Sequence, residues 1–251
     1  MKVGLIGAGN MARAMARGWG DPVLCSDSGS GRAAELVAEL GGVATTNVEV
    51  AREADLVVLC HKPAQLKAVA LEVAPYARAV ASVLGATLTG ALRDAYHGIP
   101  VFRLMPNTAV EVRRGVVCYT PTTDIDPELE RAVVALFERL GSVVTLTEAQ
   151  MGPATAVSGV GPAYQALLAE AQVDAAVRHG LGAAMAGRLV VETMAGTAAL
   201  LAHRSHDTLA VRREVTSPGG STARGLAALE RAGVRGAFQD AIDAVIAGGR
   251  A

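Results

Sequence analysis

The sequence lacks an excess of charge of either sign. Its 251 residues carry 23 Lys and Arg side chains against 24 Asp and Glu, which gives a formal net charge of −1. Proteins that bind nucleic acid or anionic membranes usually present a basic surface, so the composition gives no reason to expect either partner. A chain of this length can bury a large core in one large or two modest domains.

Long apolar runs and a cysteine framework are also missing. Although 51% of the residues are hydrophobic, no uninterrupted apolar run reaches the roughly 20 residues that span a bilayer. The N-terminal apolar stretch passes directly into glycines, as a strand does and a signal peptide does not. An odd number of widely spaced cysteines fits neither disulfides nor zinc, so we expect buried thiols, no metal and a cytoplasmic location. The cysteines are Cys25, Cys60 and Cys118.

Short apolar runs instead alternate with helical patterns through about residue 147. The runs are continuous, which is typical of parallel strands covered by helices on both faces. The expected strands are residues 3–6, 23–25, 43–44, 56–60, 79–84, 101–105, 116–119 and 143–146. The expected helices are residues 11–19, 32–40, 66–74, 88–95 and 127–140. We therefore expect a Rossmann-type α/β domain with a doubly wound sheet over residues 1–148.

Beyond residue 147 the strand-like runs stop. Helical patterns cover residues 162–179, with Pro162 in the first turn, and residues 183–203, which are rich in small side chains. We expect an all-α C-terminal domain over residues 149–251. Its small residues permit close packing either within one chain or against a second subunit.

The segment Gly7-Ala8-Gly9-Asn10-Met11-Ala12 follows the first expected strand and begins the first expected helix. This G-x-G-x-x-G/A pattern is typical of dinucleotide binding. Gly7 permits a tight turn, Gly9 lets the backbone approach a pyrophosphate, and N–H groups at the helix start attract its charge. The expected cofactor-binding residues here are Gly7, Gly9, Asn10 and Met11.

The residues after the second expected strand give conflicting signals about which nicotinamide cofactor binds. Asp27 lies 20 residues after Gly7, where a carboxylate accepts hydrogen bonds from ribose hydroxyls and favours NAD(H). Ser28, Ser30 and Arg32 follow at once and suit the 2′-phosphate of NADP(H). A plain polar loop, with Asp27 pointing into water, is also compatible. The residues alone leave these alternatives open.

Two further segments follow strands whose carboxyl ends should face the cofactor. His61-Lys62-Pro63 follows the fourth expected strand, and Met105-Pro106-Asn107-Thr108 follows the sixth. The expected cofactor contacts are His61, Lys62, Pro63, Met105, Pro106 and Asn107, together with Asn47. Because His61 has no evident carboxylate partner, it is also compatible with a solvated loop residue.

The most specific stretch of the C-terminal half is Ser217-Pro218-Gly219-Gly220-Ser221-Thr222. Its two glycines predict a tight loop, and Ser221 or Thr222 can cap the helix that continues to about residue 231. Backbone N–H groups at such a helix start can bind a carboxylate. On spacing alone, a well-capped helix remains the simpler explanation.

This stretch resembles the S-P-G-G-x-T signature of pyrroline-5-carboxylate reductases, in which an A/G-L-x-x-L-E helix follows. The sequence Gly225-Leu226-Ala227-Ala228-Leu229-Glu230 matches that helix. The resemblance extends over nearly the whole chain, in one order. The other matching segments are Gly7 to Ala12, Lys62-Pro63, Met105-Pro106-Asn107-Thr108, Ser158-Gly159-Val160-Gly161-Pro162-Ala163-Tyr164, and Glu170-Ala171 with Asp174-Ala175.

The resemblance implies NAD(P)H-dependent reduction of 1-pyrroline-5-carboxylate to L-proline, the last step of proline biosynthesis. NADP(H) is the cofactor that the family favours, with NAD(H) as the alternative. Thr222 is implied as the catalytic residue that hydrogen-bonds the imine nitrogen. The implied substrate-binding residues are Gly219, Gly220, Ser221 and Thr222. A homodimer, or a larger oligomer built from dimers, is implied as well.

Departures from the family pattern leave the substrate range open. His61 replaces a small apolar residue, Ala109 a common proline, and Ser205 a frequent acidic residue, while His206-Asp207 stands in place of a frequent His-Pro. A broader cyclic-imine reductase and a non-catalytic NADPH-sensing module therefore stay open as alternatives. A β-hydroxyacid dehydrogenase is disfavoured, because its catalytic lysine has no counterpart in residues 163–179.

Overall fold

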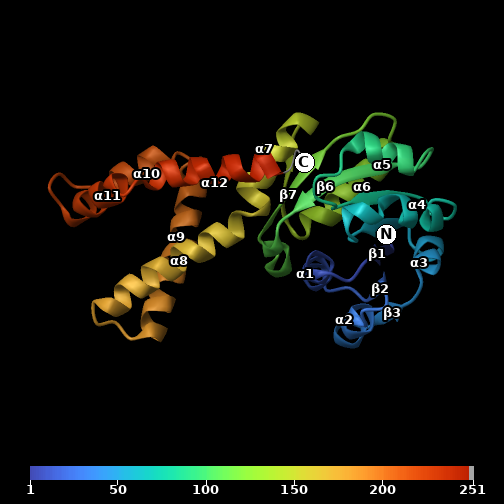
Figure 1. The fold of residues 1–251 in the computed structure, drawn as a ribbon, viewed down its shortest axis with the longest axis horizontal. Coiled ribbons are helices and arrows are strands. Elements are labelled where there is room, and N and C mark those ends of the chain that lie inside the picture. The colour runs from blue at the N-terminus through green and yellow to red at the C-terminus, as the bar shows by residue number, and fades with distance from the viewer. Residues whose placement is uncertain (249–251) are drawn as a thin grey trace. The chain divides into compact units, whose positions relative to one another are not determined.

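The structure, a computed structural model, describes residues 1–248 (Figure 1). These residues form two compact units, Met1–Pro162 with the residues from 246 on, and Ala163–Val245. By their contacts, the two units meet at residue 162, later in the chain than the expected domain boundary at residue 148. That domain boundary stays a prediction. Residues 249–251, the end of the expected second domain, lie outside the described residues.

An eight-stranded sheet with the order β3-β2-β1-β4-β5-β6-β7-β8 forms the centre of the first unit. Its strands are β1 (Val3–Ile6), β2 (Val23–Ser26), β3 (Gly42–Ala44), β4 (Leu56–Leu59), β5 (Val80–Ser82), β6 (Val101–Pro106), β7 (Gly115–Thr120) and β8 (Gly141–Thr145). All neighbours pair in parallel except β6 and β7, which are antiparallel. A short connection with one 3₁₀ turn (η2, Thr108–Val112) joins those two strands, whereas a parallel pair needs a crossover of a dozen or more residues.

Helices cover both faces of this sheet (Figure 1). One face packs against α1 (Asn10–Trp19), α2 (Arg32–Leu40) and α6 (Pro127–Glu138), and the other against α3 (Asn47–Glu53), α4 (Leu66–Val73) and α5 (Thr89–Ala95). In β4, Leu56 and Val58 enter the first core, and Val57 and Leu59 enter the second. A strand that is buried on both faces therefore has a continuous run of apolar residues in its sequence. The expected α/β fold is confirmed, with one antiparallel strand pair added.

The sequence analysis did not predict α3. This helix begins after Thr46, whose hydroxyl accepts a hydrogen bond from the backbone N–H of Glu49 at 3.2 Å. Thr followed three residues later by Glu is a known helix-start pattern. A seven-residue helix has too few turns to show a clear apolar period, so this cap was the available signal.

The second unit is helical throughout its described residues. Its helices are α8 (Gly161–Arg178), α9 (Ala183–His203), α10 (Thr208–Glu214), α11 (Ser221–Arg231) and α12 (Val234–Gly248). Helix α8 packs on α12. The ring of Tyr164 in α8 meets that of Phe238 in α12 edge to face, with 6.3 Å between the ring centroids. The connection from β8 runs through η3 (Glu148–Gln150), α7 (Met151–Ala154) and the π-helical turn η4 (Thr155–Gly159). The expected all-α C-terminal region is confirmed.

Helix α9 has an unusual composition for a surface helix. It is 21 residues long, one 18-residue window has a mean hydropathy of 1.2, and only 6% of that window is buried. By length and composition alone, such a helix could cross a membrane, although Arg188 and Glu192 interrupt it. Its exposed apolar side chains include Met185, Leu189 and Val191.

Candidate active site

The strand order reverses between β1 and β4, and doubly wound sheets bind ligands beyond the carboxyl ends of strands at such a point. Gly7 follows β1, and Cys60 follows β4, with the Cys60 N–H bonded to the Ile6 carbonyl at 2.8 Å. A Cβ atom on Gly7 would lie 2.9 Å from the carbonyl carbon and oxygen of Cys60. Since Gly7 also has φ of +101°, this tight turn requires glycine.

Helix α1 begins in the same loop with its first N–H groups uncovered. Gly9 is the N-cap, so no side chain caps the helix, and its first turn contains no acidic residue. A Cβ on Gly9 would meet nothing within 4 Å, which leaves open space in front of the helix. Ala12 is fully buried and lets α1 pack closely on the sheet. Such a helix start fits the pyrophosphate of a dinucleotide, with Asn10 and Met11 in its first turn.

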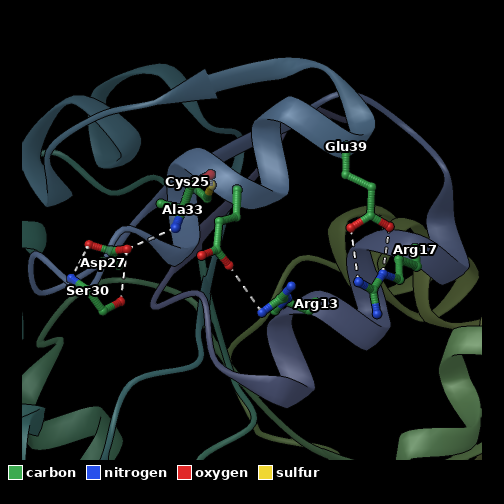
Figure 2. A network of polar contacts seen from close by, with 8 residues as sticks. Arg13, Arg17, Cys25, Asp27, Ser30, Ala33 and Glu39 are labelled. Atoms are coloured by element: carbon green, nitrogen blue, oxygen red, sulfur yellow. Dashed lines mark hydrogen bonds and ion pairs between the residues drawn. The ribbon is translucent and has the colours of Figure 1, made fainter.

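The carboxylate of Asp27 points into its own loop (Figure 2). Its Oδ1 accepts hydrogen bonds from the N–H groups of Gly29 at 2.7 Å and Ser30 at 3.1 Å. Its Oδ2 accepts from the Ser30 hydroxyl at 3.0 Å and from the Ala33 N–H at 2.8 Å. These donors, the Ala33 N–H foremost, lower the pKa of Asp27 below its usual value. The carboxylate is therefore ionised and hydrogen-bonded within its own loop. This orientation differs from both alternatives considered from the sequence, which were contact with the ribose hydroxyls and exposure to water.

The other side chains of this loop stay on the surface. Ser28, Ser30 and Arg32 are exposed, and Arg32 is the first residue of α2. Two ion pairs join α2 to α1: Arg17 with Glu39, through two contacts of 2.7 and 2.9 Å, and Arg13 with Glu35 at 3.6 Å (Figure 2). The pair Arg13–Glu35 thus holds the first turn of α2 beside α1, whose N-terminus fits a pyrophosphate, and Arg17–Glu39 joins the last turns of the two helices.

Asn47, at the start of α3, uses its side chain within the protein. Its Oδ1 accepts a hydrogen bond from the Ser26 hydroxyl at 2.6 Å, and its Nδ2 donates to Glu72 at 2.8 Å. Ser26 is the last residue of β2 and precedes Asp27. The structure therefore places Asn47 beside the loop of Asp27, and its contact with the cofactor stays a prediction. Sequence reasoning missed Ser26, the residue that holds it there.

His61 lies next to the Gly7 turn, because its backbone nitrogen would be 3.0 Å from a Cβ on Gly7. Its Nδ1 is 2.9 Å from the Lys62 carbonyl, and a carbonyl only accepts, so Nδ1 carries the proton and donates. Its Nε2 is then an acceptor, buried and without a partner among the described residues. Burial lowers the pKa of His61, so the ring is neutral at pH 7. Lys62 and Pro63 follow on the surface.

The residues at the end of β6 are mostly buried, and the strand itself includes Met105 and Pro106, which were expected to follow it. Met105 and Asn107 are 9% and 8% exposed, Pro106 is also buried, and Thr108 is exposed. The Asn107 side chain accepts a hydrogen bond from the Val116 N–H and donates one to the Ser158 carbonyl, each at 3.2 Å. Asn107 therefore ties the end of β6 to η4, and its amide is already used within the protein.

The loop Ser217–Thr222 belongs to the second unit. Gly219 has φ of +70°, and the Gly220 N–H donates to the Ser217 carbonyl at 3.1 Å. A Cβ on Gly220 would lie 2.4 Å from the Ser217 hydroxyl oxygen and 3.1 Å from the Ser217 carbonyl oxygen, so a side chain there would require Ser217 to move. Arg224, which sequence reasoning missed, donates from Nη1 to the Gly219 carbonyl at 2.8 Å and closes the loop.

Helix α11 starts differently from the expectation. Gly220 is its N-cap, no side chain caps the helix, and no acidic residue lies in its first turn. The prediction that Ser221 or Thr222 caps this helix is therefore wrong, because both already belong to the helix. As a result the first N–H groups keep their capacity to bind an anion, and Thr222 stands half-buried beside them.

Metal-ligating groups are scarce throughout residues 1–248. Within that range, no group of three or more His, Cys, Asp or Glu side chains converges in a way that could hold a metal ion. The three cysteines are free thiols, with Cys25 and Cys118 buried and Cys60 partly buried.

Each half of the chain matches a known protein family. Residues 148–250 match the family "Pyrroline-5-carboxylate reductase dimerisation", and residues 2–85 match the family "NADP oxidoreductase coenzyme F420-dependent". The pyrroline-5-carboxylate reductase of Mycobacterium tuberculosis is 36% identical over 240 residues, which cover 85% of this chain and 81% of the relative. The chain belongs to the pyrroline-5-carboxylate reductase family.

Solved structures of pyrroline-5-carboxylate reductases share the fold over the full length of the chain. The enzyme of Streptococcus pyogenes superimposes with a TM-score of 0.90 at 28% identity, covering 99% of this chain and 98% of the other. The enzyme of Plasmodium falciparum, solved with NADP bound, gives 0.88 at 26% identity, with 99% and 97% covered. The expected family, fold and enzyme class, an oxidoreductase of proline biosynthesis, are thereby confirmed.

Within the pyrroline-5-carboxylate reductase framework, the structure groups the predicted residues in two places. The glycine loop, Asp27 to Arg32, Asn47, His61 to Pro63 and Met105 to Asn107 all lie in the first unit, and the Gly219 to Thr222 loop lies in the second. Their individual roles stay predictions. The match to the dimerisation family also supports a homodimer.

Proposed function

We propose that the chain reduces 1-pyrroline-5-carboxylate to L-proline with NADPH, as a cytoplasmic homodimer or a larger assembly of dimers. The observation that carries the substrate is the start of α11, where a glycine N-cap leaves N–H groups uncapped and no acidic residue opposes an anion. The substrate is a small cyclic imine with one carboxylate, and such a helix start is a carboxylate site. Family membership supplies the reaction.

The substrate loop would act by holding two atoms of the ring. The backbone N–H groups of Ser221 and Thr222 would bind the carboxylate, and the Thr222 hydroxyl would hydrogen-bond the imine nitrogen. Gly219 and Gly220 would line the site through their backbone, because the Gly220 N–H is already bonded to the Ser217 carbonyl. When bound, NADPH supplies the hydride that adds to the imine carbon. A protonated imine is already a good hydride acceptor, so orientation can provide much of the rate without a strong acid. The loop accordingly needs no histidine–carboxylate dyad.

The first unit would bind the cofactor. We assign the pyrophosphate to the Gly7–Met11 turn, whose open space at Gly9 fits it. We assign the 2′-phosphate to Ser28 and Arg32, which are exposed in the loop that the hydrogen bonds of Asp27 hold together. The remaining contacts are proposed for Asn47, His61, Lys62, Pro63, Met105, Pro106 and Asn107. The two asparagines would contact the cofactor through backbone atoms or by shaping the surface it lies on, because their side chains form hydrogen bonds within the protein.

The direct test follows the absorbance of NADPH and of NADH, separately, with 1-pyrroline-5-carboxylate. We expect oxidation of both, with the higher kcat/KM for NADPH. A cyclic imine that lacks the carboxylate should react at least tenfold more slowly, since it loses charge-assisted hydrogen bonds worth about 1.5–3 kcal/mol each. Equal rates on the two imines would favour the broader cyclic-imine reductase, and no oxidation of either cofactor would favour the sensing module.

Thr222 provides the mutational test. We expect Thr222→Ala to lower kcat at least tenfold while the Kd for NADPH stays within twofold, because the hydroxyl is proposed to contact only the substrate. Thr222→Ser keeps the hydroxyl and should retain most of the activity. Unchanged turnover of Thr222→Ala would exclude the proposed role.

A further inference from the structure

Asp27 has no acceptor capacity left for a ligand. A carboxylate offers about four lone-pair positions, and its four hydrogen bonds, two on each oxygen, use all of them. To accept a ribose hydroxyl, the carboxylate would have to release one of these donors. Release of the Ala33 N–H or a loop N–H would leave a backbone donor unpaired, which costs free energy wherever water cannot replace the bond.

The Asp27 loop depends on these hydrogen bonds for its shape. Gly29 and Gly31 both have left-handed backbones, with φ of +87° and +77°. Gly31 is the N-cap of α2 and has no side chain to cap it. Asp27 supplies the missing cap. Its Oδ2 accepts a hydrogen bond from the N–H of Ala33, which lies six residues further along the chain in the first turn of α2.

The start of α2 is fixed from the other side of the same turn as well. The Cys25 thiol of β2 lies 3.7 Å from the Ala33 carbonyl (Figure 2). Ala33 is therefore bound through its N–H by Asp27 and through its carbonyl by Cys25. Arg32 is the residue directly before Ala33, so these two contacts determine where its backbone stands.

We propose that Asp27 is a positioning residue, which shapes the loop that presents Ser28 and Arg32 and does not bind the ribose itself. This inference rests on the proposed function, because it concerns the cofactor of that reaction. It reverses the usual significance of an acidic residue at this position, where a free carboxylate accepts from the ribose hydroxyls and favours NAD(H). The internally bonded carboxylate instead supports recognition of the 2′-phosphate.

The test uses nucleotide fragments, so that it does not depend on turnover. Isothermal titration with 2′,5′-ADP and 5′-AMP measures the two forms of the adenosine ribose on the full chain. We expect the wild type to bind 2′,5′-ADP at least tenfold more tightly. In Asp27→Ala, the Kd for 2′,5′-ADP should rise about tenfold, because Arg32 and Ser28 lose their placement, and the Kd for 5′-AMP should change less than threefold.

Asp126 offers a matched control. It caps α6 as Asp27 caps α2, since its Oδ1 accepts from the N–H groups of Glu128 and Leu129 at 2.9 Å. Loss of a cap destabilises its helix, so Asp27→Ala and Asp126→Ala should each lower the Tm by about 2–4 °C. Only Asp27→Ala should change fragment binding, and Asp27→Asn, which keeps one acceptor oxygen, should restore part of it.

Three results would overturn the inference. The first is a wild type that binds 5′-AMP as tightly as 2′,5′-ADP. The second is an Asp27→Ala variant that weakens 5′-AMP tenfold while 2′,5′-ADP is unchanged or tighter, as a ribose acceptor requires. The third is equal fragment binding by Asp27→Ala and Asp126→Ala. If the expected pattern appears but the imine is not reduced, the proposed function fails and the role of Asp27 stands.

Discussion

Gly7 and Gly9 stand two residues apart in the loop after β1, but a side chain would meet very different surroundings at each. At Gly7 a Cβ would lie 2.9 Å from backbone atoms of Cys60, and φ is +101°. At Gly9 the backbone is ordinary, with φ of −74°, and nothing lies within 4 Å of a Cβ. The fold itself therefore requires Gly7, whereas Gly9 keeps space in front of α1.

This contrast predicts that the two alanine variants fail in different ways. Gly7→Ala should lower the free energy of unfolding by roughly 2–3 kcal/mol, because the strained backbone and the clash with Cys60 add up. Gly9→Ala should leave the Tm nearly unchanged and weaken NADPH binding at least tenfold, since its methyl group would occupy the approach of the pyrophosphate. Thermal unfolding and NADPH titration of both variants check this. An equal loss of stability in the two would contradict it.

The same loop region shows which residue properties a sequence reveals. The spacing of Gly7 and Gly9, and the chemistry of Arg32, could be read without a structure. The orientation of Asp27 could not, because it depends on an N–H of Ala33, six residues away, that becomes available only once Gly31 begins α2. Likewise, the Asn107 amide donates to the carbonyl of Ser158, which lies 51 residues further along the chain.

One ion pair ties the exit of the sheet to a neighbouring helix. Arg103, in β6 and only 6% exposed in its side chain, donates to Glu148 in η3. Glu148 also accepts from the Thr89 N–H at 3.1 Å and the Thr89 hydroxyl at 2.6 Å, at the start of α5. The family match to the dimerisation segment begins at this same residue. The cluster thus anchors the segment that leads from β8 toward the helices.

Removal of the Glu148 charge should destabilise the first unit. Burial raises the pKa of Glu148, but hydrogen bonds from Arg103 and Thr89 outweigh it, so the net pKa lies below the usual 4.5. A carboxyl with a lowered folded-state pKa stabilises above its unfolded pKa and loses that contribution as the pH falls. We expect Glu148→Gln to lower the free energy of unfolding by about 1–3 kcal/mol at pH 7, because Arg103 stays buried without its partner.

Urea unfolding at pH 7 and pH 3.5 measures this contribution. The difference between the wild type and Glu148→Gln should shrink at the lower pH, because the carboxyl of the unfolded chain is mostly protonated below its usual pKa of 4.5. Glu138→Gln serves as control, since Glu138 is exposed and forms no ion pair within the described chain. A difference that is the same at both pH values would show that the charge of Glu148 does not contribute.

At the element scale, the prediction of strands succeeded where burial on both faces left a continuous apolar run, as in β4. It failed to give the direction of β7, because direction depends on the length of the connection after β6 and not on the strand's own residues. The short helix α3 was not predicted, because its seven residues are too few to show the apolar period of a helix. The cap of α11 was misassigned by one or two residues, because Gly220, Ser221 and Thr222 are all acceptable N-cap residues.

At the scale of the whole molecule, α9 is the element that a single chain explains least. A 21-residue apolar helix with 6% of its window buried would be unfavourable in water unless another surface covers it. Because residues 148–250 match the dimerisation family, we expect a second copy of the chain to cover it. Sequence patterning could not distinguish this from a single-chain bundle, because both need the same small and apolar residues.

The dimer can be tested by a charge placed on α9. Leu189 is 50% exposed in the single chain, and Leu189→Arg should disrupt the dimer because an unpaired charge in an apolar interface costs several kcal/mol. Light scattering after size exclusion should show a dimeric wild type and a monomeric variant with little activity. Leu71→Arg, on α4 of the first unit and 81% exposed, should stay dimeric and active. If Leu189→Arg remains a dimer of wild-type affinity, or if the wild type needs detergent to stay in solution, α9 is not covered by a second copy.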